Sequence, residues 1–281
     1  STTNIALSDL QLVEQETQSN ELKGTNYIYV YANGTDVENA TELQNAYNFA
    51  KNQSPSSTNV WSVICGAGKY NLDGNPLIFD TEWINVVSLT GQRDVIFTNT
   101  GSNSYLANTV NNCVFTGIDI SANTFFITSV NSNFINCNLG TNPFSNSNFS
   151  GKIKDSEILS IQSGSLISIT QSGIFDNVKS YNSNQFNLFN DGLIINSNLK
   201  NATILSNANG KFIRSNAFTF LGNITIIDSS FEVVSDKHLI NTHNNLIFKN
   251  LTAIGNIQIG IISYKDVFLK LSYNSDDVWL K

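Results

Sequence analysis

Short apolar runs recur at nearly constant spacing through most of the sequence, and this repeat constrains the fold more than any other feature. Segments rich in Asn and Ser separate the runs, which begin at Val114, Phe134, Ile153, Ile174, Ile194, Ile224, Ile247 and Val267. Successive starts lie 20, 19, 21, 20, 30, 23 and 20 residues apart, and a step near twenty is typical of one turn of a β-solenoid. One turn cannot bury its own apolar face, whereas stacked turns bury a continuous core. The repeat therefore predicts a stack of solenoid turns.

The surface of such a stack would consist mainly of neutral polar side chains. Charged residues make up only 13% of the chain, about half the usual share, while Asn occurs 43 times. Like charges on adjacent turns repel one another, whereas stacked Asn amides hydrogen-bond from turn to turn. An AT-rich genome would also enrich Asn, Ile, Lys and Phe, and we take both causes to contribute.

Charge and hydropathy exclude two classes of partner. The formal net charge is −7, and the 15 Lys and Arg residues are scattered, so no basic surface for nucleic acid is predicted. No apolar stretch approaches the roughly twenty residues of a membrane-spanning helix. The first four residues lack the basic-then-apolar pattern of a signal peptide. We therefore expect no nucleic-acid partner and no membrane span.

The three cysteines, Cys65, Cys113 and Cys137, are too few and too widely spaced for a disulfide framework or a zinc site. We expect them to be small buried residues, as suits assembly in a reducing cytoplasm. Nothing in the sequence predicts a metal or a cofactor.

The N-terminal quarter departs from the repeat. Residues 1–25 are polar, and although Leu7, Leu10 and Val13 would share one face of a helix, we favour a flexible or partner-bound attachment arm. Residues 26–281 are then predicted to form one parallel β-helix domain.

One helix is predicted within that domain, over residues 39–51. Asn39 would be its N-cap, with Glu42 at the capping-box position, and apolar residues follow at helical spacing. A single amphipathic helix ahead of the turns would cover the open end of the solenoid and block edge-to-edge association.

Several N-terminal segments resemble the start of pectin-lyase-like right-handed parallel β-helices. The Thr-Asp pair at 35–36, the LQNAY segment at 43–47 and the ICGAGKY strand and turn at 64–70 are similar to the short helix and "I-P-P-G-x-Y" turn of that superfamily. Cys65 and Ala67 replace the two prolines of this turn.

Two further segments, at 79–82 and 87–95, resemble β-helix proteins of phages and other viruses. The detailed match covers about residues 36–97, and only the repeat extends beyond it. The resemblance implies a right-handed single-stranded parallel β-helix of viral origin, commonly a homotrimer. It implies little about activity, because the superfamily contains lyases, hydrolases and binding spikes.

Catalysis on polysaccharides would require paired carboxylates. Hydrolases place two about 5–5.5 Å or 6.5–9.5 Å apart. Asp155 and Glu157 are two residues apart, so on a strand they would share a face, and Asp176 lies about one turn later. These three residues are the catalytic candidates if the chain is an enzyme. We favour the alternative that they are solvated residues of the turns.

Other candidates are weaker. Asp228, Glu232 and Asp236 form a loose acidic group near His238 and His243, whose spacing is not that of a zinc motif on a helix. The lyase families use a calcium site rich in Asp with an Arg or Lys base. Neither arginine of this chain lies in an acidic cluster.

These observations favour a non-enzymatic structural protein of a virion, most simply a phage spike, fibre or capsid decoration. The arm would contact other virion proteins, the β-helix would face outward from the virion surface, and host-surface glycans are possible ligands. The alternative from another class is a polysaccharide lyase or hydrolase, that is, a depolymerase.

Overall fold

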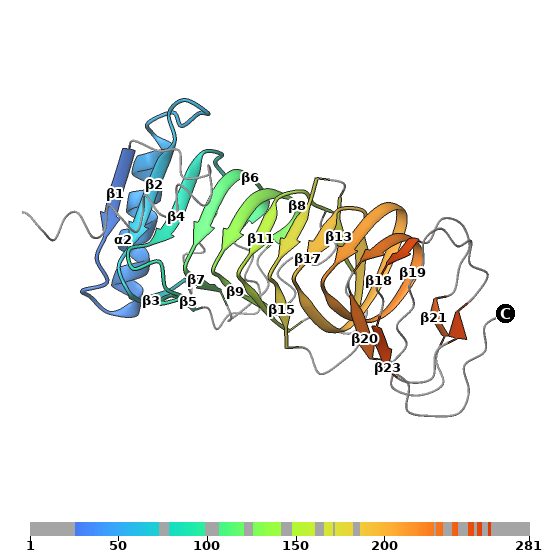
Figure 1. The fold of residues 1–281 in the computed structure, drawn as a ribbon. Helices are drawn as coiled ribbons and strands as arrows, with labels where there is room; N and C mark the ends of the chain where they lie inside the picture. Colours follow the sequence, from blue (N-terminus) through green and yellow to red (C-terminus); the bar gives the residue numbers. More distant parts are fainter. Residues whose placement is uncertain are drawn as a thin grey trace, which may run out of the picture. The chain divides into compact units, whose positions relative to one another are not determined.

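The computed structural model describes residues 26–72, 79–98, 107–120, 126–141, 148–160, 166–170, 172–181, 186–227, 229–232, 238–240, 247–249, 252–254 and 258–259. The chain divides into two compact units, Ser1–Pro143 and Phe144–Lys281, which are described separately here (Figure 1). The predicted arm, residues 1–25, lies outside the described residues. The prediction that 26–281 form one domain stays a prediction.

The described residues of the first unit form parallel strands and one helix, α2 (Asp36–Lys51). Its strands are β1 (Asn26–Val30), β2 (Trp61–Cys65), β3 (Gly68–Asn71), β4 (Ile84–Ser88), β5 (Val95–Thr98), β6 (Ala107–Thr116), β7 (Ile118–Ile120), β8 (Phe126–Ile135) and β9 (Asn138–Thr141). One parallel ladder runs β1-β2-β4-β6-β8 and a second runs β3-β5-β7-β9. The first halves of β6 and β8 pair in a third.

The second unit repeats three parallel ladders in a fixed order. Its strands are β10 (Asn148–Phe149), β11 (Lys152–Lys154), β12 (Glu157–Ser160), β13 (Leu166–Ile169), β14 (Ile174–Asp176), β15 (Lys179–Ser180), β16 (Phe186–Asn190), β17 (Leu193–Ile195), β18 (Asn198–Ile213), β19 (Asn216–Ile227), β20 (Ser230–Glu232), β21 (His238–Ile240), β22 (Ile247–Lys249), β23 (Thr252–Ile254) and β24 (Gln258–Ile259). Ladder one joins β10, β13, β16, β18, β19, β21 and β24, ladder two joins β11, β14, β17, β18, β19 and β22, and ladder three joins β12, β15, β18, β19, β20 and β23. Each successive turn thus visits the same three ladders, which confirms the predicted right-handed parallel β-helix.

One turn of the second unit was hidden in the sequence repeat. Phe212 pairs with Ile194 on one side and with Ile226 on the other. The long step between Ile194 and Ile224 therefore contains two turns and not one. The extra turn escapes the pattern because β18 and β19 each run through all three ladders without a break rich in Gly or Pro.

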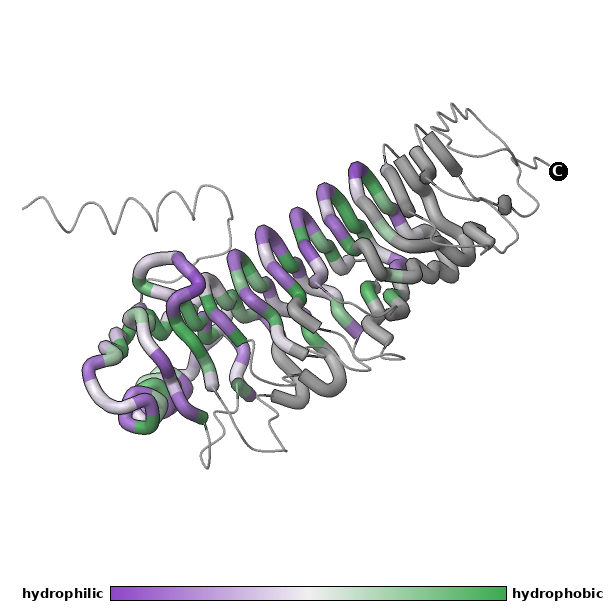
Figure 2. Tube along the Cα trace, turned by 90° about the horizontal axis from the view of Figure 1, so that it is seen from below, coloured by the Kyte–Doolittle hydropathy of each residue, from purple (hydrophilic) through white to green (hydrophobic). Residues whose placement is uncertain are grey.

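Inward-facing aromatic rings fill the core. Phe115 and Phe134 are 1% and 0% exposed, and their rings stack with centroids 5.0 Å apart and planes at 8°. In the second unit, Phe175 is fully buried and meets Phe149 edge to face at 5.7 Å. Figure 2 shows hydrophobic and hydrophilic residues alternating along the coil, as expected for strands with one inward face.

Helix α2 begins three residues before the predicted start, so the assignment of Asn39 as N-cap and Glu42 as its partner was wrong. Thr35 is the N-cap, and its hydroxyl accepts from the Glu38 N–H while the Glu38 carboxylate accepts from the Thr35 N–H. Asn39 is buried inside the first turn, where its amide donates to the Lys69 carbonyl at 3.0 Å. Two overlapping sets of cap-like residues exist here, and a purely local pattern cannot choose between them.

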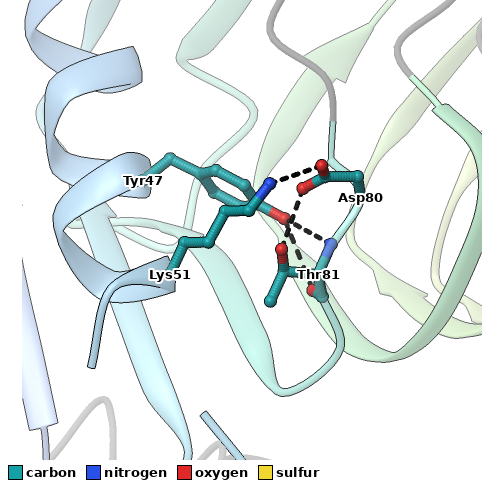
Figure 3. Close-up of polar contacts among 4 residues, drawn as sticks. All are labelled: Tyr47, Lys51, Asp80 and Thr81. Carbon is teal, nitrogen blue, oxygen red and sulfur yellow. Dashed lines mark hydrogen bonds and ion pairs between the residues drawn. The ribbon is translucent and has the colours of Figure 1, made fainter. Parts of the chain in front are cut away.

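A cluster of polar contacts fastens the C-terminal half of α2 to the chain beyond β3 (Figure 3). The Tyr47 hydroxyl accepts from the Thr81 N–H at 3.1 Å, and Lys51 forms an ion pair with Asp80. The buried face of the helix carries Ala40, Leu43, Ala46, Tyr47 and Ala50, and it contacts β1, β2, β3 and β4. The helix therefore packs on the first strands of the first unit. It does not pair with the edge of β1 that faces away from β2, so the expected block to edge-to-edge association is not seen there among the described residues. Among the described residues, no helix is long and apolar enough to cross a membrane.

Candidate functional site

The predicted catalytic residues lie at one corner of the second unit, where ladder two passes into ladder three. A single residue with left-handed backbone makes this corner in four successive turns: φ is +50° at Asp155, +54° at Asn177, +54° at Asn196 and +47° at Arg214. Asn and Asp tolerate this conformation better than most residues, because their short polar side chains bond locally. The corner therefore explains why Asn and Asp recur just after the apolar residues.

Backbone and side-chain bonds connect one corner to the next. The N–H groups of Asp155, Asn177 and Asn196 donate to carbonyls of the following turn at 3.0, 3.1 and 3.0 Å. The Asn177 amide also donates to Asp155 Oδ1 at 2.7 Å, and the Asn196 amide donates to Asp176 Oδ1 at 3.1 Å. The acceptors of these amides include two of the three candidate carboxylates.

Inside the corner, buried serines of successive turns form a ladder of hydrogen bonds, called the serine ladder. Ser197 Oγ accepts from the Val178 N–H at 3.0 Å, and the Ser197 N–H donates in turn to Ser215 Oγ at 2.9 Å. The Ser215 N–H donates to Ser229 Oγ at 3.2 Å. The hydroxyls of Ser197 and Ser215 donate at 2.8 Å to carbonyls two residues earlier, so both are satisfied although buried. This ladder was not foreseen; its sequence signal is Ser placed directly after the corner residue.

The predicted arrangement of the carboxylates was wrong in one respect. Asp155 and Glu157 do not share a strand: Asp155 lies at the corner between β11 and β12, and Glu157 is the first residue of β12. Asp176 ends β14 and pairs in register with Lys154, so Asn177, and not Asp176, occupies the position stacked on Asp155. The period-two argument failed because a left-handed residue interrupts the strand.

Each candidate carboxylate has partners on a neighbouring turn. Asp155 lies 3.8 Å from the ammonium of Lys154, in addition to its bond with Asn177. Glu157 accepts from the Tyr181 hydroxyl at 3.3 Å and pairs in register with Lys179. Asp155 and Glu157 thus lie on one turn and Asp176 on the next, and each contacts a residue of a neighbouring turn.

The described residues contain no group of three or more His, Cys, Asp or Glu side chains that could hold a metal ion. The three cysteines are free and buried, as predicted. Burial raises the pKa of Cys113 to about 11 and that of Cys137 to about 12, and it raises the pKa of Cys65 as well. All three thiols are therefore protonated near neutral pH and are poor nucleophiles. Of the second acidic group, Asp228, Asp236 and His243 lie outside the described residues, as do the side chains of Glu232 and His238.

The first unit carries its own polar network, which the sequence did not predict. Arg93 donates to Asn136 Oδ1 at 3.0 Å and to Asn138 Oδ1 at 2.8 Å, and the Asn138 amide donates to Asp119 Oδ2 at 3.1 Å. Asn136, with φ of +51°, is a left-handed corner residue like those of the second unit. The guanidinium is used here to join two turns.

No protein-family model matches the sequence, and no curated protein matches it. Among solved structures, the A-module of the mannuronan C-5 epimerase AlgE4 of Azotobacter vinelandii is similar, with a TM-score of 0.47 and 10% identity. The match covers 78% of this chain and 74% of that chain. The assignment of a β-helix rests on the strand pairings of the chain itself.

Proposed function

We propose that the chain is a non-enzymatic structural protein of a virion, in the class of phage spikes, fibres and capsid decorations. The observation that carries the proposal is the use of the candidate carboxylates as hydrogen-bond acceptors between turns. In this role residues 1–25 attach the protein to other virion proteins, the β-helix faces outward, and three copies come together on the assembled particle. The trimer follows from the resemblance to viral β-helices.

The contacts of Asp155 and Asp176 argue against a catalytic role for these two carboxylates. A general acid or base needs an oxygen that reaches the substrate and exchanges a proton with it. Asp155 and Asp176 each direct an oxygen at the amide of a neighbouring turn, and Lys154 lies beside Asp155. Such contacts engage one oxygen of each carboxylate in a bond between turns. Their simplest role is to keep the corner in register.

Purified particles provide the direct test of the virion role. The chain should co-sediment with gradient-purified virions from the source culture and should be detected by mass spectrometry at a stoichiometry that fits a structural component. Its presence only in the soluble fraction of the lysate would contradict the proposal. A variant lacking residues 1–25 should fold but should no longer co-sediment, which separates attachment from folding.

The second candidate is a depolymerase, favoured by one specific feature. Tyr181 is 58% exposed, and its hydroxyl contacts Glu157, so an aromatic ring and a carboxylate lie side by side at the surface. Such a pair resembles a sugar-binding subsite, in which the ring stacks on a pyranose and the carboxylate bonds its hydroxyls.

An activity assay separates the two candidates. Incubation with host capsule or lipopolysaccharide should release neither reducing ends nor unsaturated sugars. Turnover that is lost in Glu157→Gln, Asp155→Asn or Asp176→Asn, and kept in Asp119→Asn, would overturn the structural role and establish a depolymerase. Binding that is lost in Tyr181→Ala without any turnover would support a glycan-binding virion protein.

A further inference from the structure

Strand β1 is the first strand of the first unit, and it has a described partner on one side only. All five of its residues pair in parallel with β2. Gly66 donates its N–H to the Val30 carbonyl, so the Val30 peptide groups point toward β2. Because successive residues of a strand alternate in direction, the N–H and C=O groups of Tyr27 and Tyr29 point to the opposite edge. No described residue pairs with that edge, and in Figure 1 β1 lies at the extremity of the unit.

A row of three tyrosines marks the outward face of this edge. Tyr27, Tyr29 and Tyr31 are 54%, 47% and 60% exposed, while Val30 between them is buried. The rings of Tyr29 and Tyr31 stack with centroids 6.2 Å apart and planes at 13°. Exposed edge strands in native proteins usually carry a charge, a proline or a bulge that prevents association. Residues 26–31, NYIYVY, contain none of these.

Residues 27–31, which are most of β1 and the residue after it, are chemically symmetric about Tyr29, and this symmetry identifies the partner. The sequence reads Tyr-Ile-Tyr-Val-Tyr over 27–31. Under a twofold axis through Tyr29, an antiparallel copy places Tyr29 opposite itself and Tyr27 opposite Tyr31. Every outward pair is then aromatic on aromatic, which is a favourable cross-strand combination. A twofold contact requires this kind of self-complementary patch.

We propose that β1 pairs edge to edge with β1 of a second copy of the chain, antiparallel and centred on Tyr29. The strand is uncharged, so two copies meet there without like-charge repulsion although each carries a net charge of −7. The N–H and C=O groups of Tyr29, which no described residue of the chain bonds at this edge, face those of the other Tyr29 and form a hydrogen-bonded pair. This inference does not depend on the proposed virion role. Pairing at this edge involves none of the residues of the corner in the second unit.

The available area limits the strength of the contact. A fully buried aromatic side chain covers about 150–250 Å². Three half-exposed tyrosines on each copy therefore supply roughly 500–800 Å² in total, less than the ~1,200 Å² at which stable interfaces begin. We therefore expect a weak dimer that dissociates on dilution, with a Kd between about 1 μM and about 1 mM.

Cysteine substitution in the full chain tests the register. In a hydrogen-bonded antiparallel pair, opposite Cα atoms lie ~5.5 Å apart, within the range of a disulfide. Tyr29→Cys should therefore form a covalent dimer under mild oxidation. Tyr27→Cys should not, because position 27 lies about 14 Å from its own copy, at ~3.4 Å per residue over four residues. The double variant Tyr27→Cys with Tyr31→Cys should form the dimer again. The native cysteines are buried, so the unmodified chain serves as the blank.

A second measurement does not depend on crosslinking. Sedimentation velocity of the unmodified chain from about 1 μM to about 1 mM should show a monomer converting to a dimer. Tyr29→Lys should abolish this dimer, because it places two ammonium groups together at the axis, whereas Tyr181→Lys should leave it unchanged. A chain that stays monomeric throughout, a Tyr29→Lys variant that still dimerises, or a Tyr27→Cys variant that crosslinks as readily as Tyr29→Cys would overturn the proposal.

Discussion

The two units connect their turns by different means. In the first unit, the inward faces carry a continuous series of rings: Phe79 meets Phe97 at 6.2 Å and Phe115 at 5.3 Å, and Phe115 stacks on Phe134. In the second unit, apolar residues of ladder two alternate between Ile and Phe, and buried serines connect the corners. Large rings bury much apolar area but make no directional contacts. The serine hydroxyls make directional hydrogen bonds but bury little apolar area. A β-helix can therefore fix its register through shape or through hydrogen bonds.

One position shows the difference most directly. Cys137 follows the corner residue Asn136 just as Ser197 follows Asn196. Both side chains point inward and donate to the carbonyl two residues earlier, at 3.4 Å from sulfur and 2.8 Å from oxygen. The hydroxyl also accepts an N–H from the preceding turn, and thiols are weaker in both roles. The first unit therefore carries the weaker hydrogen-bonding group at this position.

The largest expected effect is the loss of a stacked ring. Phe134→Ala removes a fully buried side chain that stacks on Phe115, and it should lower the free energy of unfolding by about 3–5 kcal/mol. Tyr181→Ala, at an exposed site, is the control and should change it by less than about 1 kcal/mol. Denaturant unfolding measures both. Equal effects would mean that rings do not hold the first unit together.

The next effect tests the serine ladder. Ser197→Ala leaves the Val178 N–H without its acceptor inside the core, and it should cost about 1–3 kcal/mol. Cys137→Ser is the matched exchange in the first unit, and it should cost less than about 1 kcal/mol, because other turns accept Ser at this place. If Cys137→Ser proves the more damaging of the two, the two positions are not equivalent.

Two variants of Asn177 separate the cost of the left-handed backbone from the cost of losing the side-chain hydrogen bond. Asn177→Ala loses the bond to Asp155 and also places a Cβ residue without a stabilising side chain at φ of +54°, which should cost about 1–2 kcal/mol. Asn177→Gly loses only the bond, because Gly adopts this conformation freely, so it should cost less. Thermal unfolding of both variants gives the comparison. A more stable Ala variant would contradict the left-handed corner.

The smallest effect concerns the attachment of helix α2. Partial burial alone would raise the pKa of Asp80, but the hydrogen bond and charge of Lys51, with the Thr81 hydroxyl, hold it below its usual value. A carboxyl whose pKa is depressed in the folded state stabilises the fold above its unfolded pKa of about 3.9, and this contribution is lost as the pH falls through the folded value. Both side chains are more than two-fifths exposed, so the pair is worth roughly 0–1 kcal/mol.

Asp80→Asn should therefore lower stability slightly at pH 7, and the difference from the unmodified chain should vanish at acid pH. Unfolding curves at both pH values measure it. A difference that grows on acidification would show that Lys51 does not stabilise the charged form of Asp80.

The fold was predictable because its determinants are local and repeated, but several details were not. An apolar run every twenty residues predicts a solenoid, yet the turn through Phe212 was missed because two adjacent turns there lack a spacer. The start of α2 depends on whether Thr35 or Asn39 is the N-cap. Thr35 caps the helix, and the Asn39 side chain bonds the backbone of β3 instead. Asp155 was placed on a strand because nothing in a period-two pattern reveals a left-handed residue. The hydrogen-bond partners of the candidate carboxylates lie one turn away, so a local pattern does not reveal them.

The corner of the second unit also determines where the chain can change length. In five successive turns, two residues separate the strand of ladder two from the strand of ladder three. They lie between β11 and β12, β14 and β15, β17 and β18, β18 and β19, and β19 and β20. The remaining connections vary between turns. Insertions and deletions are therefore absorbed away from this corner, where they leave the phase of the coil intact. A lineage carrying this scaffold can remodel one flank freely, and an engineer can graft a foreign epitope there, while any indel at the corner would shift all later turns out of register.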